Sequence, residues 1–290
     1  MAAPLPLCYL NGEFLPLAEA RISPLDRSFL YGDGVYEVMP VYAGRPFAFE
    51  AHCARLTRSL GEILMSDPLS REEWRHLFAT LIERNGGGDM YVYWQVSRGA
   101  ENGRNHAPLP DIPRTVFAFC APWPATSPAV LTDGVACVTT DDTRWARCDI
   151  KSVSLLANVL LRQLAVDGNA AETILLRNGE LTDASASSVH VIIGGELRTP
   201  PNSHKLLPGT TRTVLEELAV RTGISYRSVR VTEAELRSAD EVWIAAATRE
   251  VQAVTRLDGQ PVGTGKPGPL WQRIRAEYDR YKLEQAGQPW

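Results

Sequence analysis

Lysine is scarce in this chain of 290 residues, which holds four lysines against twenty-six arginines. Long apolar runs are absent, since none approaches the roughly 20 residues that a membrane helix needs. The net charge of -4 gives no basic surface for nucleic acid. The opening MAAPLPLCYLNG lacks the basic start and long apolar core of a signal peptide. These absences predict a cytoplasmic protein that binds neither membrane nor nucleic acid.

Cysteine and histidine are also few. The five cysteines are odd in number and scattered, without a CxxC pair, which is typical of reduced thiols in a cytosolic protein. The five histidines show no metal-ligand spacing, so we expect no metal site.

Strand-like and helical segments are interspersed without a regular βαβ rhythm, which favours a mixed α+β fold. CYLNGEFLPL reads as two strands around an Asn-Gly turn, and MYVYWQVSRG and TVFAFCA read as further strands. Apolar periodicity predicts helices over 50–64, 71–84, 211–221 and 270–284. We predict a small N-terminal domain over 1–120, a Pro- and Ser-rich linker over 121–129, and a larger C-terminal domain over 130–290 that carries Lys151.

One of the four lysines has a setting suited to chemistry. The other three lie in predicted turns or loops or on the polar side of a predicted helix: Lys205, Lys266 and Lys282. Lys151, in RCDIKS, follows a strand-like run and precedes a helix with a leucine-rich face, so we expect its ammonium to be partly desolvated. Desolvation favours loss of the proton, which arginine does not undergo in proteins. The alternative is a structural lysine that pairs with Asp149 or Asp142.

Five blocks in a fixed order surround this lysine: LDRSFLYGDGVYEV at 25–38, HCARL at 52–56, TRWARCDIKSVSLLANVL at 143–160, ETILLRNGELTDASASSV at 172–189 and LLPGTTR at 206–212. The set resembles the fold-type IV pyridoxal-phosphate enzymes, which include D-amino-acid transaminases, branched-chain aminotransferases and aminodeoxychorismate lyases. The resemblance runs from about residue 7 to residue 280 and is closest to the bacterial D-amino-acid transaminases. It implies a two-domain α+β fold and pyridoxal 5′-phosphate held as a Schiff base by Lys151.

The resemblance also implies the ligands of the cofactor phosphate. Arg55 in HCARL matches the family's phosphate arginine. Gly209, Thr210 and Thr211 open a predicted helix, whose N-terminal amides suit an anion. Thr248 in AAATRE matches a further hydroxyl on the phosphate side.

Two residues match positions around the cofactor ring. Arg144 corresponds to an arginine near the phenolic oxygen, and its alternative is an ion pair with Asp142. Asp183 in TDAS stands where most members have Glu, one methylene longer, as the partner of the ring nitrogen. A protonated ring is the electron sink of this chemistry. The alternative for Asp183 is a turn-forming residue after Asn178-Gly179.

Three residues match the substrate carboxylate site of the D-amino-acid transaminases. Tyr36 lies in GVYEV, and Arg104 and His106 form an Arg-x-His pair in a loop one residue longer than the family pattern. Arg98 is the second candidate for the carboxylate arginine if Arg104 does not match. The alternative is that the loop with Arg104 and His106 is solvent-exposed and binds no substrate. Pro40 replaces a basic residue that is common in the family. Because the family's loop reaches into the neighbouring subunit, the resemblance implies a homodimer.

The implied reaction is a ping-pong transamination from a D-amino acid, of the D-alanine or D-glutamate type, to a 2-oxo acid such as 2-oxoglutarate or pyruvate. Lys151 would act as the general base at Cα. The rival functions on the same fold are transamination of (R)-amines or branched-chain L-amino acids and, less favoured, an aminodeoxychorismate lyase. A cofactor-free binding protein is the rival outside enzymes.

Overall fold

The structure, a computed structural model, describes residues 3–123, 126–287 and 290. It divides into two compact units: unit 1 comprises residues 1–124, 150–154 and 285–290, and unit 2 comprises 125–149 and 155–284. The division falls within the predicted linker 121–129, of which residues 124 and 125 lie outside the described residues. The sequence placed Lys151 in the C-terminal domain, whereas segment 150–154 belongs to unit 1 because it pairs with a strand there.

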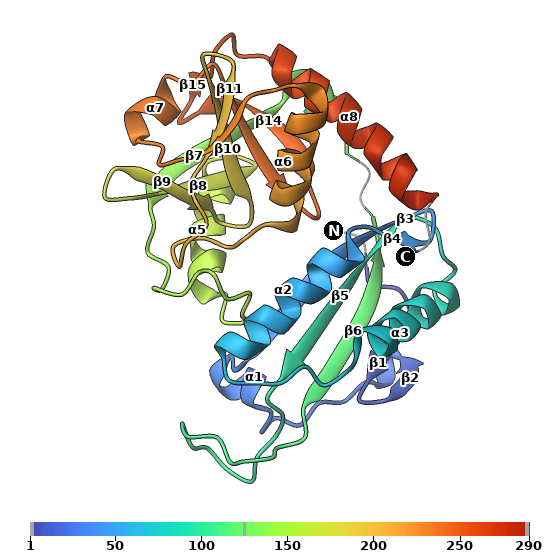
Figure 1. The fold of residues 1–290 in the computed structure, drawn as a ribbon. Coiled ribbons are helices and arrows are strands. Elements are labelled where there is room, and N and C mark those ends of the chain that lie inside the picture. Colours follow the sequence, from blue (N-terminus) through green and yellow to red (C-terminus); the bar gives the residue numbers. More distant parts are fainter. Residues whose placement is uncertain (1–2, 124–125, 288–289) are drawn as a thin grey trace. The chain divides into compact units, whose positions relative to one another are not determined.

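Unit 1 is built on a six-stranded antiparallel sheet with the order β2-β1-β6-β5-β3-β4 (Figure 1). Its strands are β1 (Leu7–Leu10), β2 (Glu13–Pro16), β3 (Gly34–Tyr42), β4 (Arg45–Pro46), β5 (Met90–Ser97) and β6 (Thr115–Pro122). Asn11 and Gly12 turn β1 into β2 with φ angles of 50° and 102°, the left-handed backbone that an Asn-Gly hairpin requires. The predicted hairpin is therefore confirmed.

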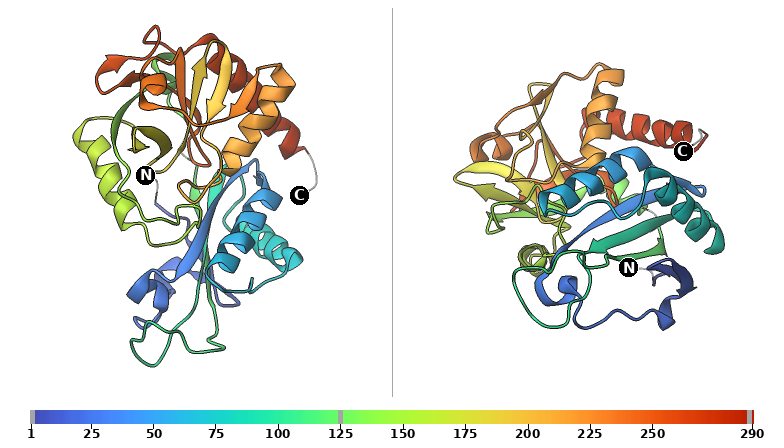
Figure 2. Two further views of the ribbon diagram at one scale, coloured as in Figure 1. Left: turned by 60° about the vertical axis from the view of Figure 1, so that its left-hand side comes forward. Right: turned by 60° about the horizontal axis from the view of Figure 1, so that its bottom comes forward.

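Two helices, α2 (Phe49–Glu62) and α3 (Arg71–Arg84), cover one face of this sheet (Figures 1 and 2). A capping box, in which the side chains of Ser70 and Glu73 each accept from the other residue's backbone, starts α3. Trp74 and Phe78 of α3 pack on Trp94 of β5 in the core, with ring centroids 4.7 to 6.4 Å apart. The helices predicted over 50–64 and 71–84 are confirmed. The short helix α1 (Arg27–Tyr31) was not predicted.

Because side chains alternate along a strand, the sheet also has a second face, away from the core. There Tyr36 of β3 stacks on Tyr93 of β5, and Tyr93 stacks on Phe119 of β6, with centroid separations of 5.6 and 5.1 Å. This aromatic row is half-buried.

Unit 2 contains a nine-stranded mixed sheet with the order β12-β11-β10-β13-β14-β7-β8-β9, and β15 pairs with β14. The strands are β7 (Val135–Asp141), β8 (Glu172–Arg177), β9 (Glu180–Ala184), β10 (Ser188–Ile193), β11 (Glu196–Thr199), β12 (Tyr226–Ser228), β13 (Glu241–Ala246), β14 (Glu250–Leu257) and β15 (Gln260–Pro261). The pairs β7–β8, β7–β14 and β11–β12 are parallel. Most of the buried apolar core of unit 2 comes from strands β7 to β10, β13 and β14.

The helices of unit 2 are α4 (Pro128–Asp133), α5 (Leu156–Asp167), α6 (Thr210–Thr222), α7 (Glu233–Arg237) and α8 (Pro269–Ala286). Helix α4 begins inside the predicted linker because Ser127 caps its first turn and Pro128 suits the first helical position. Helices α6 and α8 confirm the predictions over 211–221 and 270–284. No helix in the described part of the chain has the length and apolarity needed to cross a bilayer.

Helix α5 differs from its expected role. It begins at Leu156, beyond Lys151, and five of its large apolar side chains are exposed, from 44% at Leu164 to 73% at Leu156, whereas Leu161 is buried. Its polar side chains bond to unit 2 instead: Asn158 donates to the carbonyl of Ser185, and Arg162 to that of Ala171. Lys151 itself is half-buried, whereas the apolar face expected on this helix is exposed.

Candidate active site

Lys151 lies in an extended segment that adds to the edge of β3. Strand β4 pairs only with the last residues of β3, so the edge of the first half is available to another segment. The amide of Tyr36 donates to the carbonyl of Lys151 at 3.0 Å, and the amide of Val153 donates to that of Gly34 at 3.0 Å. Ile150 anchors the segment in the core of unit 1. This pairing, rather than helix α5, positions the lysine.

The ammonium of Lys151 lies over the ring of Tyr36, with Nζ 4.2 Å from the ring centroid. Within the described residues it makes no ion pair. Both carboxylates proposed as structural partners are bound by arginines: Asp149 by Arg147 at 3.0 and 3.1 Å, and Asp142 by Arg144 at 3.0 and 3.1 Å. Lys151 and Tyr36 are thus brought together, and no carboxylate of the described residues pairs with the amine.

Arg55, the predicted phosphate arginine, is held by a buried carboxylate directly after Tyr36 in the chain. Nε and Nη2 of Arg55 donate to the two oxygens of Glu37, each at 2.7 Å, and Nδ1 of His52 lies 2.8 Å from Oε2. Burial alone would raise the pKa of Glu37, but the Arg55 charge and the hydrogen bonds lower it to about 2. Burial lowers the pKa of His52. Glu37 and His52 were missed, although His52 and Arg55 stand one helical turn apart in α2.

Asp183 and Arg144 contact each other in unit 2. Asp183, on β9, is 6% exposed, and its Oδ2 accepts from Nη1 of Arg144 at 3.1 Å and from the amide of Leu207 at 3.4 Å. Burial raises the pKa of Asp183 to about 6, against the opposing effect of Arg144. The ion pair of Arg144 with Asp142, offered as the alternative, is present, and Thr182 also donates to Asp142 at 2.8 Å.

Three of the other predicted phosphate residues lie together at the start of α6. Gly209 is the N-cap, and Thr210 and Thr211 are the first two helical residues, both buried. A Cβ at Gly209 would lie 3.5 Å from the hydroxyl of Ser188 on β10, so the backbone approaches that strand closely. The first amides of a helix have no partner within the helix and attract anions. Thr248, the remaining predicted phosphate residue, lies outside α6. It is exposed in the turn between β13 and β14, and β13 is the neighbour of β10 in the sheet.

Arg104 and His106 lie together in unit 1, on the ring of Tyr31. Cζ of Arg104 is 5.0 Å from the centroid of that ring, and the His106 ring is 5.5 Å from it. In the described chain, no hydrogen bond or ring contact joins either residue to Tyr36 or Lys151. The fallback, Arg98, is bound to Asp33 at 2.8 and 3.0 Å and to the carbonyl of Ile63 at 2.7 Å.

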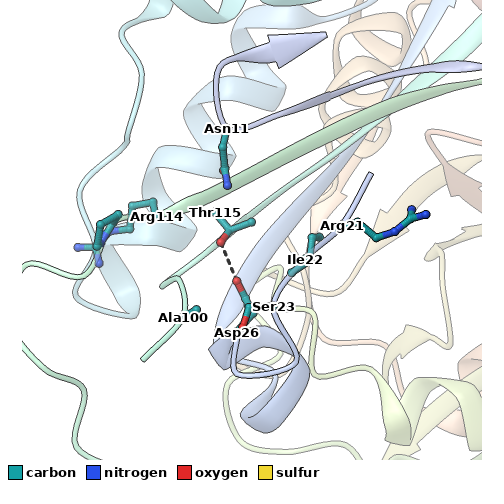
Figure 3. A pocket seen from close by; sticks show the side chains of 9 residues that line it. Asn11, Arg21, Ile22, Ser23, Asp26, Ala100, Arg114 and Thr115 are labelled. Atoms are coloured by element: carbon teal, nitrogen blue, oxygen red, sulfur yellow. Dashed lines mark hydrogen bonds between the residues drawn. The ribbon is translucent and has the colours of Figure 1, made fainter. Parts of the chain in front are cut away.

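A hollow of about 310 Å³ in unit 1 contains none of these residues (Figure 3). Asp26 lies at its wall, and its carboxylate accepts from Thr115 at 2.7 Å, from Ser97 at 2.9 Å and from the amide of Ser28 at 2.8 Å. These bonds give Asp26 a structural role, as the cap of α1 and the link to β5 and β6.

Comparison with known proteins decides the family. The family model described as Amino-transferase class IV matches residues 34–257. The chain belongs to the class IV aminotransferases. The resemblance and the predicted α+β fold are therefore confirmed.

Relatives of this class IV aminotransferase match along nearly the whole chain. The D-alanine aminotransferase of Staphylococcus aureus (strain MSSA476) is 37% identical over 94% of this chain and 96% of its own. Those of Listeria monocytogenes (serotype 1/2a, strain 10403S) and Bacillus licheniformis are 37% and 36% identical, over 95% and 91% of this chain and 94% and 93% of their own.

Solved structures show the same fold. A T.th. branched-chain amino acid aminotransferase with pyridoxamine 5′-phosphate has a TM-score of 0.90 and 27% identity, covering 97% of this chain and 95% of its own. The branched-chain amino acid aminotransferase from Escherichia coli has a TM-score of 0.88 at 23% identity, covering 99% and 97%. At that identity the second likeness concerns the fold alone.

Proposed function

We propose that this class IV aminotransferase moves the amino group of a D-amino acid, of the D-alanine or D-glutamate type, to a 2-oxo acid such as 2-oxoglutarate or pyruvate. The observation that carries the reaction is the amine of Lys151, placed over Tyr36 without a carboxylate partner in the described residues. The identity to three D-alanine aminotransferases over more than nine-tenths of the chain supports the substrate class.

The residues present fit pyridoxal 5′-phosphate, the cofactor of this enzyme class. Asp183 is a buried carboxyl with a raised pKa, which a cationic ring nitrogen beside it would lower. The N-terminus of α6 carries Gly209 as its cap and two threonines, a donor set suited to a phosphate. We assign Arg55 and Thr248 to the phosphate as well, and Arg144 to the phenolic side of the ring.

Bound pyridoxal phosphate supplies an aldehyde that condenses with amines and a ring that accepts the electron pair left at the substrate's Cα. Lys151 would hold the cofactor, and its freed amine would act as the base that takes the proton from the substrate Cα. Asp183 would stabilise the protonated form of the cofactor ring. Two half-reactions of this kind form a ping-pong cycle.

The substrate carboxylate is assigned to Tyr36, Arg104 and His106. A guanidinium binds a carboxylate through two charge-assisted hydrogen bonds, which an apolar pocket does not replace. We propose a homodimer in which Arg104 and His106 serve the neighbouring subunit. The exposed apolar side chains of α5 support self-association, because contiguous apolar patches on soluble proteins commonly mark interfaces. Sedimentation velocity that shows a monomer at working concentrations would contradict this assembly.

Five free cysteines, all buried, support a reducing compartment, and we place the enzyme in the cytoplasm. Fractionation of cells that express the full chain would test this placement.

The half-reaction tests the substrate class directly. The cofactor-loaded enzyme is mixed with one donor at a time, and the loss of the internal cofactor absorbance is followed without an acceptor. D-alanine or D-glutamate should react faster than L-leucine and (R)-1-phenylethylamine, and Lys151→Ala should abolish the reaction. A preference for L-leucine would instead support the branched-chain function, which the likeness to the T.th. branched-chain enzyme favours as the second candidate.

A further inference from the structure

Arg27, at the start of α1, has no role in the assignments above, yet it contacts the loop that carries Arg104 and His106. Its side chain is 3% exposed. Nη1 donates to the carbonyl of Asn105 at 2.7 Å, and Nη2 donates to the carbonyl of His106 at 3.0 Å. One buried guanidinium therefore binds two consecutive peptide groups, directly after Arg104.

Two carboxylates hold this guanidinium in place. Nε of Arg27 donates to Asp33 at 2.8 Å, and Nη1 lies 3.3 Å from Oε2 of Glu101. The other oxygen of Glu101 accepts from the amide of Leu109 at 2.9 Å. Arg27 and Glu101 thus tie the middle of the loop to both of its ends, and the amide of Arg27 donates to the carbonyl of Gly99 at 2.8 Å.

Tyr31, one helical turn after Arg27, provides the surface on which the loop side chains lie. Cζ of Arg27 is 4.6 Å from the centroid of the Tyr31 ring, and Cζ of Arg104 is 5.0 Å from it. The His106 ring is tilted by 52° against the same ring. The backbone of the Arg-x-His pair and both of its side chains are therefore fixed from α1.

We propose that Arg27 is a positioning residue for substrate carboxylate recognition, which it serves by holding the Arg104–His106 backbone on α1. This role rests on the proposed function, since it takes Arg104 and His106 as the carboxylate ligands. An unanchored loop would have to be ordered at the moment of binding, and this cost weakens affinity without changing the chemical step. Within the described residues, the polar and ring contacts of the Arg27 side chain are with Asp33, Glu101, Tyr31 and the loop backbone, and Arg27 is not among the residues assigned to substrate or cofactor.

The test compares Arg27→Met and Arg27→Lys with wild type in the full-length, cofactor-loaded enzyme. Met removes every side-chain hydrogen bond to the loop, whereas Lys keeps the charge but not the fork that reaches two carbonyls. Arg275→Lys is the matched control, because Arg275 is a buried arginine of α8 bound to Glu250 and Asp279 and outside the site.

Two readouts separate positioning from general damage. Hydrogen exchange of peptides over 99–110 should become faster in Arg27→Met, intermediate in Arg27→Lys, and unchanged in Arg275→Lys. In the D-alanine half-reaction, the concentration for half-maximal rate should rise about tenfold in Arg27→Met, with the maximal rate nearly unchanged. The cofactor absorbance should stay at the wild-type position.

Unchanged exchange over 99–110 in a folded variant would overturn the proposal, and so would a fall in maximal rate with unchanged D-alanine dependence. If Arg27→Met does not fold, the intermediate behaviour of Arg27→Lys still decides. A wild-type enzyme inert toward both D-alanine and D-glutamate would refute the proposed function, while the exchange measurement would still report whether Arg27 holds the loop.

Discussion

Two buried carboxylates, Glu37 in unit 1 and Asp183 in unit 2, are each paired with an arginine, yet their acidities move in opposite directions. Glu37 accepts two hydrogen bonds from Arg55 and contacts His52, and its pKa falls to about 2. Asp183 accepts one bond from Arg144, whose other two donor groups bind Asp142, and its pKa rises to about 6.

The number of charge-assisted hydrogen bonds decides between these outcomes, because burial penalises both carboxylates alike. Glu37 has enough of them to stay charged and to hold Arg55 in a fixed orientation. Asp183 does not, so a further cationic partner, which we propose is the ring nitrogen, would stabilise its charged form. A carboxylate that is fully paired by its own protein serves structure, and one that is partly paired can serve a ligand.

The largest effect is expected from Glu37→Gln. Removal of the charge leaves Arg55 buried without its partner, and loss of one member of a buried pair costs roughly 3–5 kcal/mol in the free energy of unfolding. Urea unfolding of the cofactor-free protein measures this. Glu50→Gln is the control, because Glu50 pairs with two arginines of α3 at the surface and should cost less than about 0.5 kcal/mol. An equal loss in the free energy of unfolding for Glu37→Gln and Glu50→Gln would contradict the structural role of the buried pair.

The pH dependence of stability should differ in sign between the two carboxyls. Folded cofactor-free protein retains the Asp183 proton up to about pH 6, whereas the unfolded chain releases it near 3.8, so this group lowers stability as the pH rises through that window. Asp183→Asn should therefore gain about 2 kcal/mol relative to wild type between pH 4 and pH 7. Glu37 instead adds stability above 4.5 that is lost as the pH falls toward 2. A difference between Asp183→Asn and wild type that does not change with pH would refute the raised pKa.

Asp183→Ala should lose activity and keep its fold. Without a carboxylate to hold the ring proton, we expect a loss of roughly 100-fold or more in kcat/KM, similar to removal of a preorganised electrostatic group elsewhere. The D-alanine half-reaction at saturating cofactor measures it, with urea unfolding as the control for stability. Full activity in this variant would remove Asp183 from the mechanism.

The smallest effect is expected from Asp183→Glu. The longer side chain restores the residue that most of the family carries, so activity should stay within about threefold of wild type or rise. Steady-state rates with D-alanine and 2-oxoglutarate measure this. A loss as large as that of Asp183→Ala would mean that the backbone of β9 has adapted to the shorter side chain.

Local features could be predicted from sequence because their causes lie within a few residues. The Asn11-Gly12 turn, the apolar periodicity of α3 and the capping glycine of α6 are of this kind. The scarcity of lysine also singled out Lys151 as a candidate, and the family resemblance then assigned it as the cofactor lysine. The family blocks then supplied candidate partners that periodicity does not reveal.

Contacts between distant segments could not be predicted in this way. Nothing in RCDIKS shows that its lysine segment would pair with the edge of β3 and belong to unit 1. Leu156, Leu160 and Leu164 of α5 were expected on an apolar face that desolvates Lys151, but these three side chains are exposed. The pair of Glu37 with Arg55 and the anchoring of the loop by Arg27 bring together residues far apart in the chain. Such pairings depend on strand register and helix placement, which a single sequence leaves open.

The sequence by itself indicated Lys151 as the candidate nucleophile and base, because only an amine that can lose its proton performs both steps and the family resemblance assigns this lysine to the cofactor. It also indicated the family, which the comparison with known proteins confirmed. The tertiary structure decided how each charged residue is partnered, and with it whether a carboxylate is strongly acidic or holds its proton to about pH 6. Burial and hydrogen-bond count set that difference, and both arise only when the chain is folded.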